Sequence, residues 1–286
     1  MLNSICQIQD KRFDSLKKYS YCILKFDTII NGKIQADVPS MGTGFFLKLD
    51  DRVFLVSADH VFTGFDGWDK YVNTQKKYKY LVISVPLTNG KRELYVINAS
   101  KSLKNAVRID YRTYGDIFAD ELVNFPKNAD IHFLNPYLYS SSPDDNLDSL
   151  VAFGFGLTEI ENQQFEKNDL ENRDKFFADA LQGSTIKKYF SKVTKNPPVG
   201  EDANINKIFD SLYISCQPGA DQGSSGSPVF SYKMDKITGK YKIKFAGIIC
   251  ASGTTGSKLL YGIMLRKIEV KKAMEYYFKL SKYLRP

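Results

Sequence analysis

Short runs in which apolar and polar residues alternate recur along most of the chain. Turns rich in asparagine, glycine and lysine separate them, as at Asn89-Gly90-Lys91. Alternation with a period of two is typical of strands that bury one face. The pattern predicts strands at 21–28, 44–49, 53–57, 81–86, 92–97 and 131–134 in the first half, and at 150–156, 211–216, 228–232, 241–250 and 259–265 in the second. Short strands at this spacing are typical of all-β barrels.

Several segments depart from this alternation. Residues 1–18 predict an arm with a helical turn, and the irregular stretch 101–125 predicts a short helix at 115–121. Residues 159–207 are mostly polar and predict a surface insertion that is partly helical near 174–181. After residue 266, apolar residues recur at spacings of three and four, which predicts an amphipathic helix that packs on a barrel.

These patterns divide the chain into four parts. At 286 residues the chain fits either one large domain or two small ones. We expect an N-terminal arm (1–18), a first barrel (19–140), a second barrel (141–265) that contains the insertion 159–207, and a C-terminal helix (266–286).

The composition is ordinary for a soluble globular protein. Hydrophobic residues make up 43% and charged residues 25% of the chain, and no apolar run reaches the roughly 18 residues that could span a membrane. The first ten residues lack a basic stretch followed by an apolar one, so we expect no secretion signal, a cytoplasmic location and no membrane partner. The 4 cysteines lie far apart with no C-x-x-C pair, which predicts buried thiols and no metal site.

The formal net charge of +8 would suit an acidic partner. The lysines are nevertheless scattered singly among acidic residues, and the richest segment, 266–282, fits the solvated face of the predicted helix. A nucleic-acid-binding barrel is an alternative that rests on charge alone and predicts strongly salt-dependent DNA binding. We expect no nucleic acid partner, because no RRM, zinc-finger or helix-turn-helix signature accompanies the charge.

A glycine- and serine-rich turn at 221–227 leads directly into the apolar strand predicted at 228–232. We interpret Ser225 as a nucleophile, because Gly223 and Gly226 on either side lack a Cβ and let a substrate carbonyl approach. The amide hydrogens of Gly223 and Ser225 can then converge on one point, as an oxyanion hole requires. The alternative is a loop that merely reverses the chain.

A serine nucleophile needs a base, which is most often a histidine held by a carboxylate. The chain contains only 2 histidines, His60 and His132, and both precede Ser225, so the order His, Asp, Ser is the one that remains open. His60 follows the pair of strands predicted at 44–49 and 53–57 and is our candidate for the base. His132 is assigned a structural role.

Asp130 is the candidate for the carboxylate, because it opens the alternating strand predicted at 131–134. Asp116 and Asp110 compete with it for this position.

Four ordered motifs between about residues 20 and 265 resemble those of trypsin-like (chymotrypsin-fold) serine peptidases. Gly-Thr-Gly-Phe-Phe at 42–46 and Leu-Val-Ser-Ala-Asp-His-Val at 55–61 resemble that family's strand pair and histidine turn. Asn-Ala-Asp-Ile-His-Phe-Leu at 128–134 resembles its acid segment, and Gly-Ser-Ser-Gly-Ser-Pro at 223–228 its nucleophile segment. Phe-Ala-Gly-Ile-Ile-Cys-Ala-Ser-Gly at 245–253 resembles its substrate-lining strand. Since no disulfide framework is expected, the chain looks more like bacterial intracellular or HtrA-like relatives.

The resemblance implies two six-stranded antiparallel β-barrels with a C-terminal amphipathic helix. It also implies a cofactor-free endopeptidase that forms an acyl-enzyme on a protein or peptide substrate, with His60 as base, Asp130 as its orienting acid and Ser225 as nucleophile. The alternative is a catalytically silent or conditionally active module that binds a peptide strand or a partner protein.

Two further expectations come from the resemblance. Ser224 stands where many relatives carry an aspartate that pairs with a newly cut N-terminal amine, so we expect activation by substrate or by a partner protein that reshapes 217–224. The small residues at the substrate wall would leave room for a side chain and pair with an extended peptide, and none is acidic, so a strong preference for arginine or lysine is not expected. The residues assigned to substrate binding are Gly219, Ala220, Ala251, Ser252 and Gly253.

Overall fold

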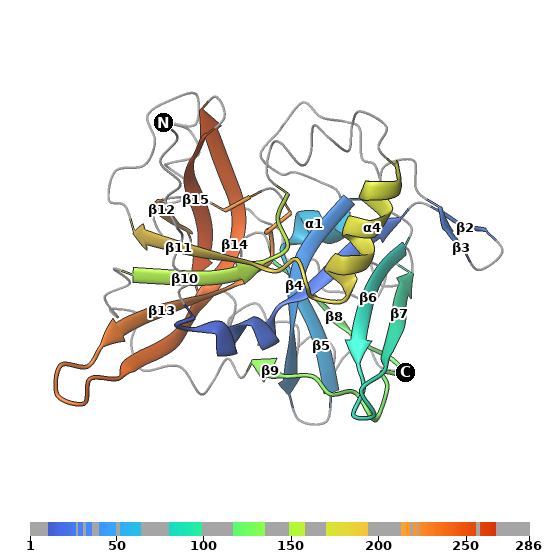
Figure 1. Ribbon diagram of the computed structural model, residues 1–286, viewed down its shortest axis with the longest axis horizontal. Helices are drawn as coiled ribbons and strands as arrows, with labels where there is room; N and C mark the ends of the chain where they lie inside the picture. Colours follow the sequence, from blue (N-terminus) through green and yellow to red (C-terminus); the bar gives the residue numbers. More distant parts are fainter. Residues whose placement is uncertain are drawn as a thin grey trace, which may run out of the picture.

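The structure is a computed structural model of the chain, and its elements are those of an all-β protein. It describes residues 11–26, 28–30, 33–35, 40–49, 52–63, 80–98, 117–134, 149–157, 170–193, 213–217, 220–221, 223–255 and 258–266. Figure 1 shows two sheets side by side, one built from the first half of the sequence and the other from the second. The predicted two-sheet, all-β architecture is confirmed.

The first sheet is curled and follows the strand order β7-β6-β1-β4-β5-β8, with β9 parallel to β4. Among the described residues its two end strands do not pair, so this sheet is open where a closed six-stranded barrel was expected. Its strands are β1 (Tyr21–Phe26), β4 (Ser40–Leu49), β5 (Arg52–Ser57), β6 (Tyr80–Pro86), β7 (Arg92–Asn98), β8 (Phe118–Glu121) and β9 (Phe133–Leu134), and a separate hairpin holds β2 (Thr28–Ile30) and β3 (Lys33–Gln35).

The second sheet closes into the predicted six-stranded barrel, in the order β10-β11-β12-β15-β14-β13. Closure removes exposed strand edges, which would otherwise offer backbone groups to other chains. Its strands are β10 (Ser149–Gly154), β11 (Lys187–Val193), β12 (Tyr213–Gln217), β13 (Pro228–Met234), β14 (Tyr241–Thr255) and β15 (Lys258–Arg266).

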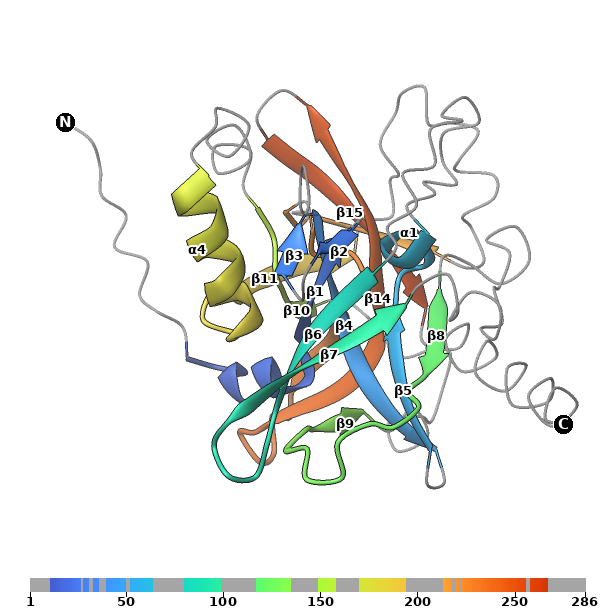
Figure 2. The same ribbon diagram turned by 90° about the vertical axis from the view of Figure 1, so that its right-hand side faces the viewer.

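Three helical elements are described: the 3-10 helix η1 (Asp14–Tyr19), α1 (Asp59–Thr63) and α4 (Leu170–Leu181). Helix α4 packs on the outside of the first sheet through Phe177 and Ala180, which share a buried cluster with Leu24 and Val82 (Figure 2). No helix in the described part of the chain is long and apolar enough to cross a membrane.

One buried cluster joins the two sheets. Phe45 and Phe54 of the first sheet meet Phe153, Phe230 and Phe245 of the second, and all five are at most 2% exposed. The rings of Phe45 and Phe245 lie 5.6 Å apart in an edge-to-face arrangement. Because these side chains interlock, loops at the junction of the sheets rest on a common core.

The prediction of a helix at 115–121 is wrong, because residues 118–121 form the strand β8. Phe118 pairs with Ser57 and Glu121 with Phe54, so β8 is an antiparallel neighbour of β5. Ala119 and Asp120 favour strands little on their own, but pairing with a buried strand outweighs local propensity.

The segment predicted as a polar insertion, 159–207, contains the barrel strand β11 as well as α4. The lysines of β11 made this segment look like a polar surface loop. They are compatible with a barrel strand because the apolar stem of a lysine can lie along an apolar surface. Lys188 Nζ lies 5.7 Å from the ring centroid of Phe153 and 5.8 Å from that of Phe190. The C-terminal helix predicted at 266–286 lies outside the described residues beyond Arg266.

The cysteines that can be assessed are buried thiols. Cys22 and Cys250 form no disulfide within the described residues and are almost completely buried, and burial raises the pKa of Cys22. Cys6 lies outside the described residues. Buried thiols with a raised pKa are poor nucleophiles, so Cys22 is not a competitor to Ser225.

Candidate active site

Two consecutive tight turns place Ser225. The Ser224 N–H donates to Asp221 O over 3.1 Å, and the Ser227 N–H donates to Ser224 O over 3.0 Å. The third residue of each turn is a glycine with a positive φ, +94° at Gly223 and +85° at Gly226. Turns of this kind require a positive φ at that position, which glycine adopts at little cost. The spacing of glycines on which the nucleophile assignment rested therefore has a structural reason.

Thr43 of β4 ties this double turn to the rest of the junction. Its N–H donates to Ser225 O over 2.9 Å, and its Oγ1 donates to Gly223 O over 3.2 Å. Thr43 Oγ1 also accepts from the Phe155 N–H over 2.9 Å, and Thr43 is fully buried. One residue of the first sheet thus fixes the backbone on both sides of Ser224. Thr43 was not among the predicted site residues, although it lies between two glycines, Gly42 and Gly44.

The double turn also packs against the residues that lead to His60. A Cβ placed on Gly226 would lie 2.1 Å from Ser57 Oγ, 2.1 Å from Thr43 O and 2.9 Å from the Ala58 nitrogen. Ser57 is the last residue of β5, and its Oγ donates to Thr43 O over 2.6 Å. His60 follows three residues later on the short helix α1 and is half-buried. The structure therefore brings the Ser225 turn and the His60 turn together.

The two N–H groups predicted to form an oxyanion hole are not used elsewhere in the described structure. Neither the Gly223 nor the Ser225 N–H donates to an acceptor within the described ranges. Ser224 O is held by both the N–H and the Oγ of Ser227, over 3.0 and 2.6 Å. Because C=O and N–H point in opposite directions across a planar trans peptide, the Ser225 N–H points away from Ser227.

Asp130 lies in a loop and does not open a strand, since β9 begins at Phe133. Its N–H donates to Pro86 O over 2.8 Å, and its side chain is exposed. Burial raises the pKa of Tyr21 to about 12, and the negative charge of Asp130 adds to this increase, so Asp130 lies within electrostatic range of Tyr21. Pro86 belongs to β6, and β1 and β4 separate β6 from the His60 strand β5 in the sheet order.

His132 is exposed, and its ring lies edge-on to Tyr19 with the centroids 6.1 Å apart. Its N–H donates to Tyr21 Oη over 3.1 Å.

The alternative acids, Asp110 and Asp116, lie outside the described residues. Ile117, which directly follows Asp116 in the sequence, is described and is 1% exposed. The next residue, Phe118, pairs with Ser57, three residues before His60. The start of β8 thus lies beside the end of the His60 strand.

The predicted substrate wall follows β14. Ala251, Ser252 and Gly253 pair with Ile263, Gly262 and Tyr261 of β15. On its other side β14 pairs with β13 only as far as Ile248, which faces Pro228, and Ile249 then exchanges two hydrogen bonds with the Ser225 turn. Beyond this point no described strand covers that side of β14. Ala220 is buried, and Gly219 lies outside the described residues.

Comparison with known proteins gives the fold and leaves the activity open. No family model and no curated protein matches the chain. Among solved structures, the thermostable serine protease AL20 from an extremophilic microorganism aligns with a TM-score of 0.50 at 10% identity, over 92% of this chain and 97% of that one. The protease Anisep from Arthrobacter nicotinovorans aligns with a TM-score of 0.47 at 11% identity, over 86% and 89% of the two chains. GrC aligns with a TM-score of 0.47 at 14% identity, over 92% and 95%.

At such identities the likeness to AL20 is evidence for the fold alone. The chain has the fold of chymotrypsin-like serine proteases. Assignment to a bacterial intracellular or HtrA-like type stays a prediction.

Proposed function

We propose that this protein is a serine endopeptidase in which Ser225 is the nucleophile and His60 the base. One observation carries the proposal. Gly226, next to Ser225, packs against Thr43 and against Ser57 and Ala58, which lie just before His60 in the chain. A serine and a histidine brought together in this way, beside N–H groups that donate to no described acceptor, match the requirements of acyl transfer.

In the proposed reaction, Ser225 Oγ attacks the scissile carbonyl and its proton passes to His60. The negative charge on the carbonyl oxygen is stabilised by the N–H groups of Gly223 and Ser225. His60 then delivers the proton to the departing amine, and an acyl group remains on Ser225. Water activated by His60 hydrolyses this ester, which restores the enzyme.

The substrate we propose is a protein or peptide in extended conformation. Residues 250–255 of β14 continue past the last pairing with β13, so an added strand could hydrogen-bond there. The small residues Ala251, Ser252 and Gly253 would line this path, together with Gly219 and Ala220. No cofactor is needed for the reaction.

Of the acid candidates, the strand register favours Asp116 over Asp130. Asp116 lies two residues before the strand that pairs with the His60 strand, whereas Asp130 is hydrogen-bonded to β6 and exposed. The acid must reach the ring nitrogen of His60 to fix its tautomer. Asp116→Asn should therefore lower kcat by about 10⁴-fold, the size of effect that loss of the acid has in triads of this kind. Asp130→Asn should leave kcat within about threefold; the opposite result would restore Asp130 as the acid.

The experiment that tests the proposed function is hydrolysis of a fluorogenic peptide library by purified Ser225→Ala. Hydrolysis should fall to the background rate. The control is Ser184→Ala, which alters an exposed serine hydroxyl bonded to Asp179 O and should cut at the wild-type rate. Hydrolysis by Ser225→Ala at the wild-type rate would overturn the proposal.

A second candidate function is a catalytically silent module that binds a peptide strand. It is favoured by one observation: within the described ranges, no hydrogen bond joins Ser225 Oγ to His60 or to any other residue. This module would bind extended peptides at β14 with the same affinity in wild type and Ser225→Ala, and neither protein would cut them.

A further inference from the structure

A half-buried polar cluster of Asp221, Lys187 and Tyr189 adjoins the double turn that carries Ser225. Asp221, the first residue of the double turn, accepts from Lys187 Nζ and from Tyr189 Oη through its Oδ2, each over 3.3 Å. The side chains of Lys187 and Asp221 are only 25% and 16% exposed. Lys187 and Tyr189 are two residues apart on β11, so they face the same side of the strand. An ion pair this well shielded is weakened less by salt than a surface pair.

This cluster is continuous with the turn that carries Gly223. Asp221 O accepts from the Ser224 N–H over 3.1 Å, so movement of Asp221 would disturb the turn between them. The cluster and the turn pack tightly around Gly156. A Cβ at Gly156 would lie 2.3 Å from Tyr189 Oη, 2.5 Å from Asp221 Cβ and 2.8 Å from Ser224 Oγ. Ser224 Oγ is itself fully buried and has no hydrogen-bond partner among the residues that the structure describes. The Ser224 side chain thus does not hold this turn, which is fixed by Thr43 at Gly223 and Ser225 and by Asp221 and its partners at its start.

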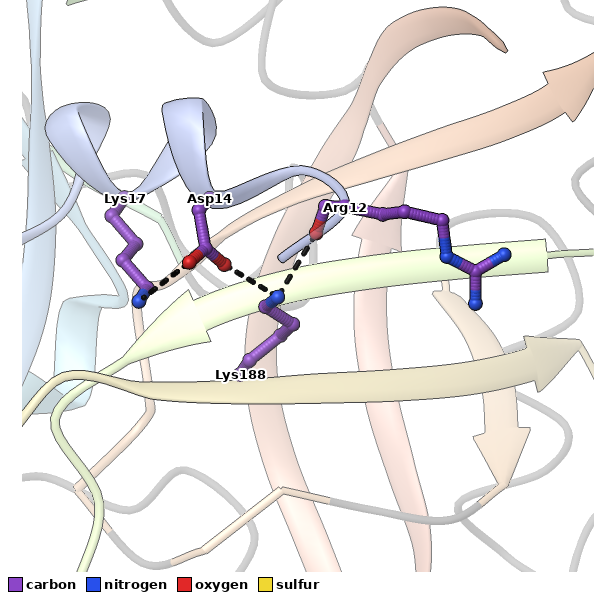
Figure 3. Close-up of polar contacts among 4 residues, drawn as sticks. All are labelled: Arg12, Asp14, Lys17 and Lys188. Atoms are coloured by element: carbon purple, nitrogen blue, oxygen red, sulfur yellow. Dashed lines mark hydrogen bonds and ion pairs between the residues drawn. The ribbon is translucent and has the colours of Figure 1, made fainter. Parts of the chain in front are cut away.

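The strand that supplies Lys187 is anchored on its other face as well. Lys188, the next residue, points to the opposite side of β11, where its Nζ lies 2.5 Å from Asp14 Oδ1 and donates to Arg12 O over 2.9 Å (Figure 3). Asp14 also pairs with Lys17 over 3.3 Å. Lys187 therefore projects from a strand held on both faces.

We propose that Lys187 is a positioning residue, whose ion pair with Asp221 holds the 221–224 turn so that the Gly223 and Ser225 N–H groups face the substrate oxygen. The Lys187 ammonium would then supply the positive charge that holds the turn. A freed N-terminal amine could not supply it at Ser224, because the Ser224 hydroxyl offers that amine no carboxylate. The inference rests on the proposed function, since it concerns the oxyanion hole of the same reaction.

The test measures kcat and KM on one peptide for Lys187→Met, and inhibition by a peptide aldehyde of the same sequence. The aldehyde adds to Ser225 Oγ, and its oxygen would occupy the oxyanion hole. We expect kcat to fall about 10- to 100-fold, up to the loss caused by removing a single oxyanion donor. KM should stay within about threefold, and the aldehyde should lose affinity by the same factor as kcat/KM. A merely structural role would not make these two losses equal.

Three variants sharpen the result. Lys187→Arg keeps the charge and should retain most of kcat. Asp221→Asn combined with Lys187→Met should be no slower than the slower single variant, because both act through one pair. Tyr189→Phe removes only a hydroxyl, so it preserves the fold if Lys187→Met does not fold, and it should lower kcat about three- to tenfold. Lys192→Met alters an exposed lysine of the same strand and should match wild type.

An unchanged kcat in both Lys187→Met and Tyr189→Phe would overturn the inference while leaving the serine-peptidase proposal intact. So would an equal loss in Lys192→Met, which would show a general effect of altering the strand. Full hydrolysis by Ser225→Ala would instead remove the proposed function itself.

Discussion

Thr43→Val should weaken both the fold and the chemistry, because Thr43 joins the nucleophile turn to the first sheet. Valine has nearly the shape of threonine but cannot donate to Gly223 O or accept from the Phe155 N–H. Thr43 is 0% exposed and Phe155 2%, so water cannot replace the lost partner of the Phe155 N–H. A hydrogen bond contributes about 1 kcal/mol, and a buried group left without a partner costs about 1–3 kcal/mol. We therefore expect the free energy of unfolding to fall by about 2–4 kcal/mol.

The assay for this prediction is urea unfolding followed by circular dichroism, together with the rate of acylation by a fluorophosphonate. Acylation should slow at least about tenfold in Thr43→Val under conditions where the variant is still folded, because Gly223 is no longer held. Thr43→Ser keeps the hydroxyl and is the matched control; it should acylate at nearly the wild-type rate. A Thr43→Val protein within about 0.5 kcal/mol of wild type and equally reactive would refute the assignment of Thr43 as the link.

Four other outcomes are expected. Gly226→Ala should abolish activity and destabilise the protein severely, because at a φ of +85° its Cβ would lie 2.1 Å from the backbone oxygen of Thr43. Gly239→Ala is the control: its φ is +65° with nothing within 4 Å of the added Cβ, so it should lower the free energy of unfolding by only about 1 kcal/mol. Equal unfolding free energies of the two variants would contradict this prediction. Burial lowers the pKa of Lys25 to about 8 from 10.5, so the folded state disfavours its charged form, and Lys25→Met should stabilise the protein at pH 7 by up to about 3 kcal/mol. That gain should shrink as pH rises through 8 and vanish above about 10.5, and a gain independent of pH would show that burial of the charge is not its cause. Peptide kcat/KM should rise between about pH 6 and 8 as the His60 imidazole loses its proton, and chelators should leave it unchanged; a rate abolished by EDTA and restored by zinc would point to a metal enzyme. An uncleavable tag fused to Met1 should leave the rate on the same peptide unchanged, and activity that appears only after a cut near the N-terminus would indicate a zymogen.

Much of the fold was predictable because local pattern and tertiary structure agree. The apolar runs in 228–232 and 241–250 mark strands, and both belong to the closed barrel as β13 and β14. The two glycines around Ser225 were informative for a physical reason, because each occupies a turn position with positive φ.

Other features depend on partners distant in sequence and could not be read locally. β8 is a strand because it pairs with β5, and three of its four residues, Ala119, Asp120 and Glu121, have little strand preference of their own. β11 carries three lysines, which concealed it within a polar segment, and Lys187 lies 34 residues from its partner Asp221. The choice between Asp130 and Asp116 likewise depends on strand register, which alternation alone does not reveal.

The most direct test of the central claim is to locate the adduct of a fluorophosphonate probe by peptide mass spectrometry. We expect a single adduct on the peptide that contains Ser225, formed by the wild type and lost in His60→Ala while that variant stays folded. An adduct on another residue, or an equal rate of labelling in His60→Ala, would show that Ser225 is not a nucleophile activated by His60.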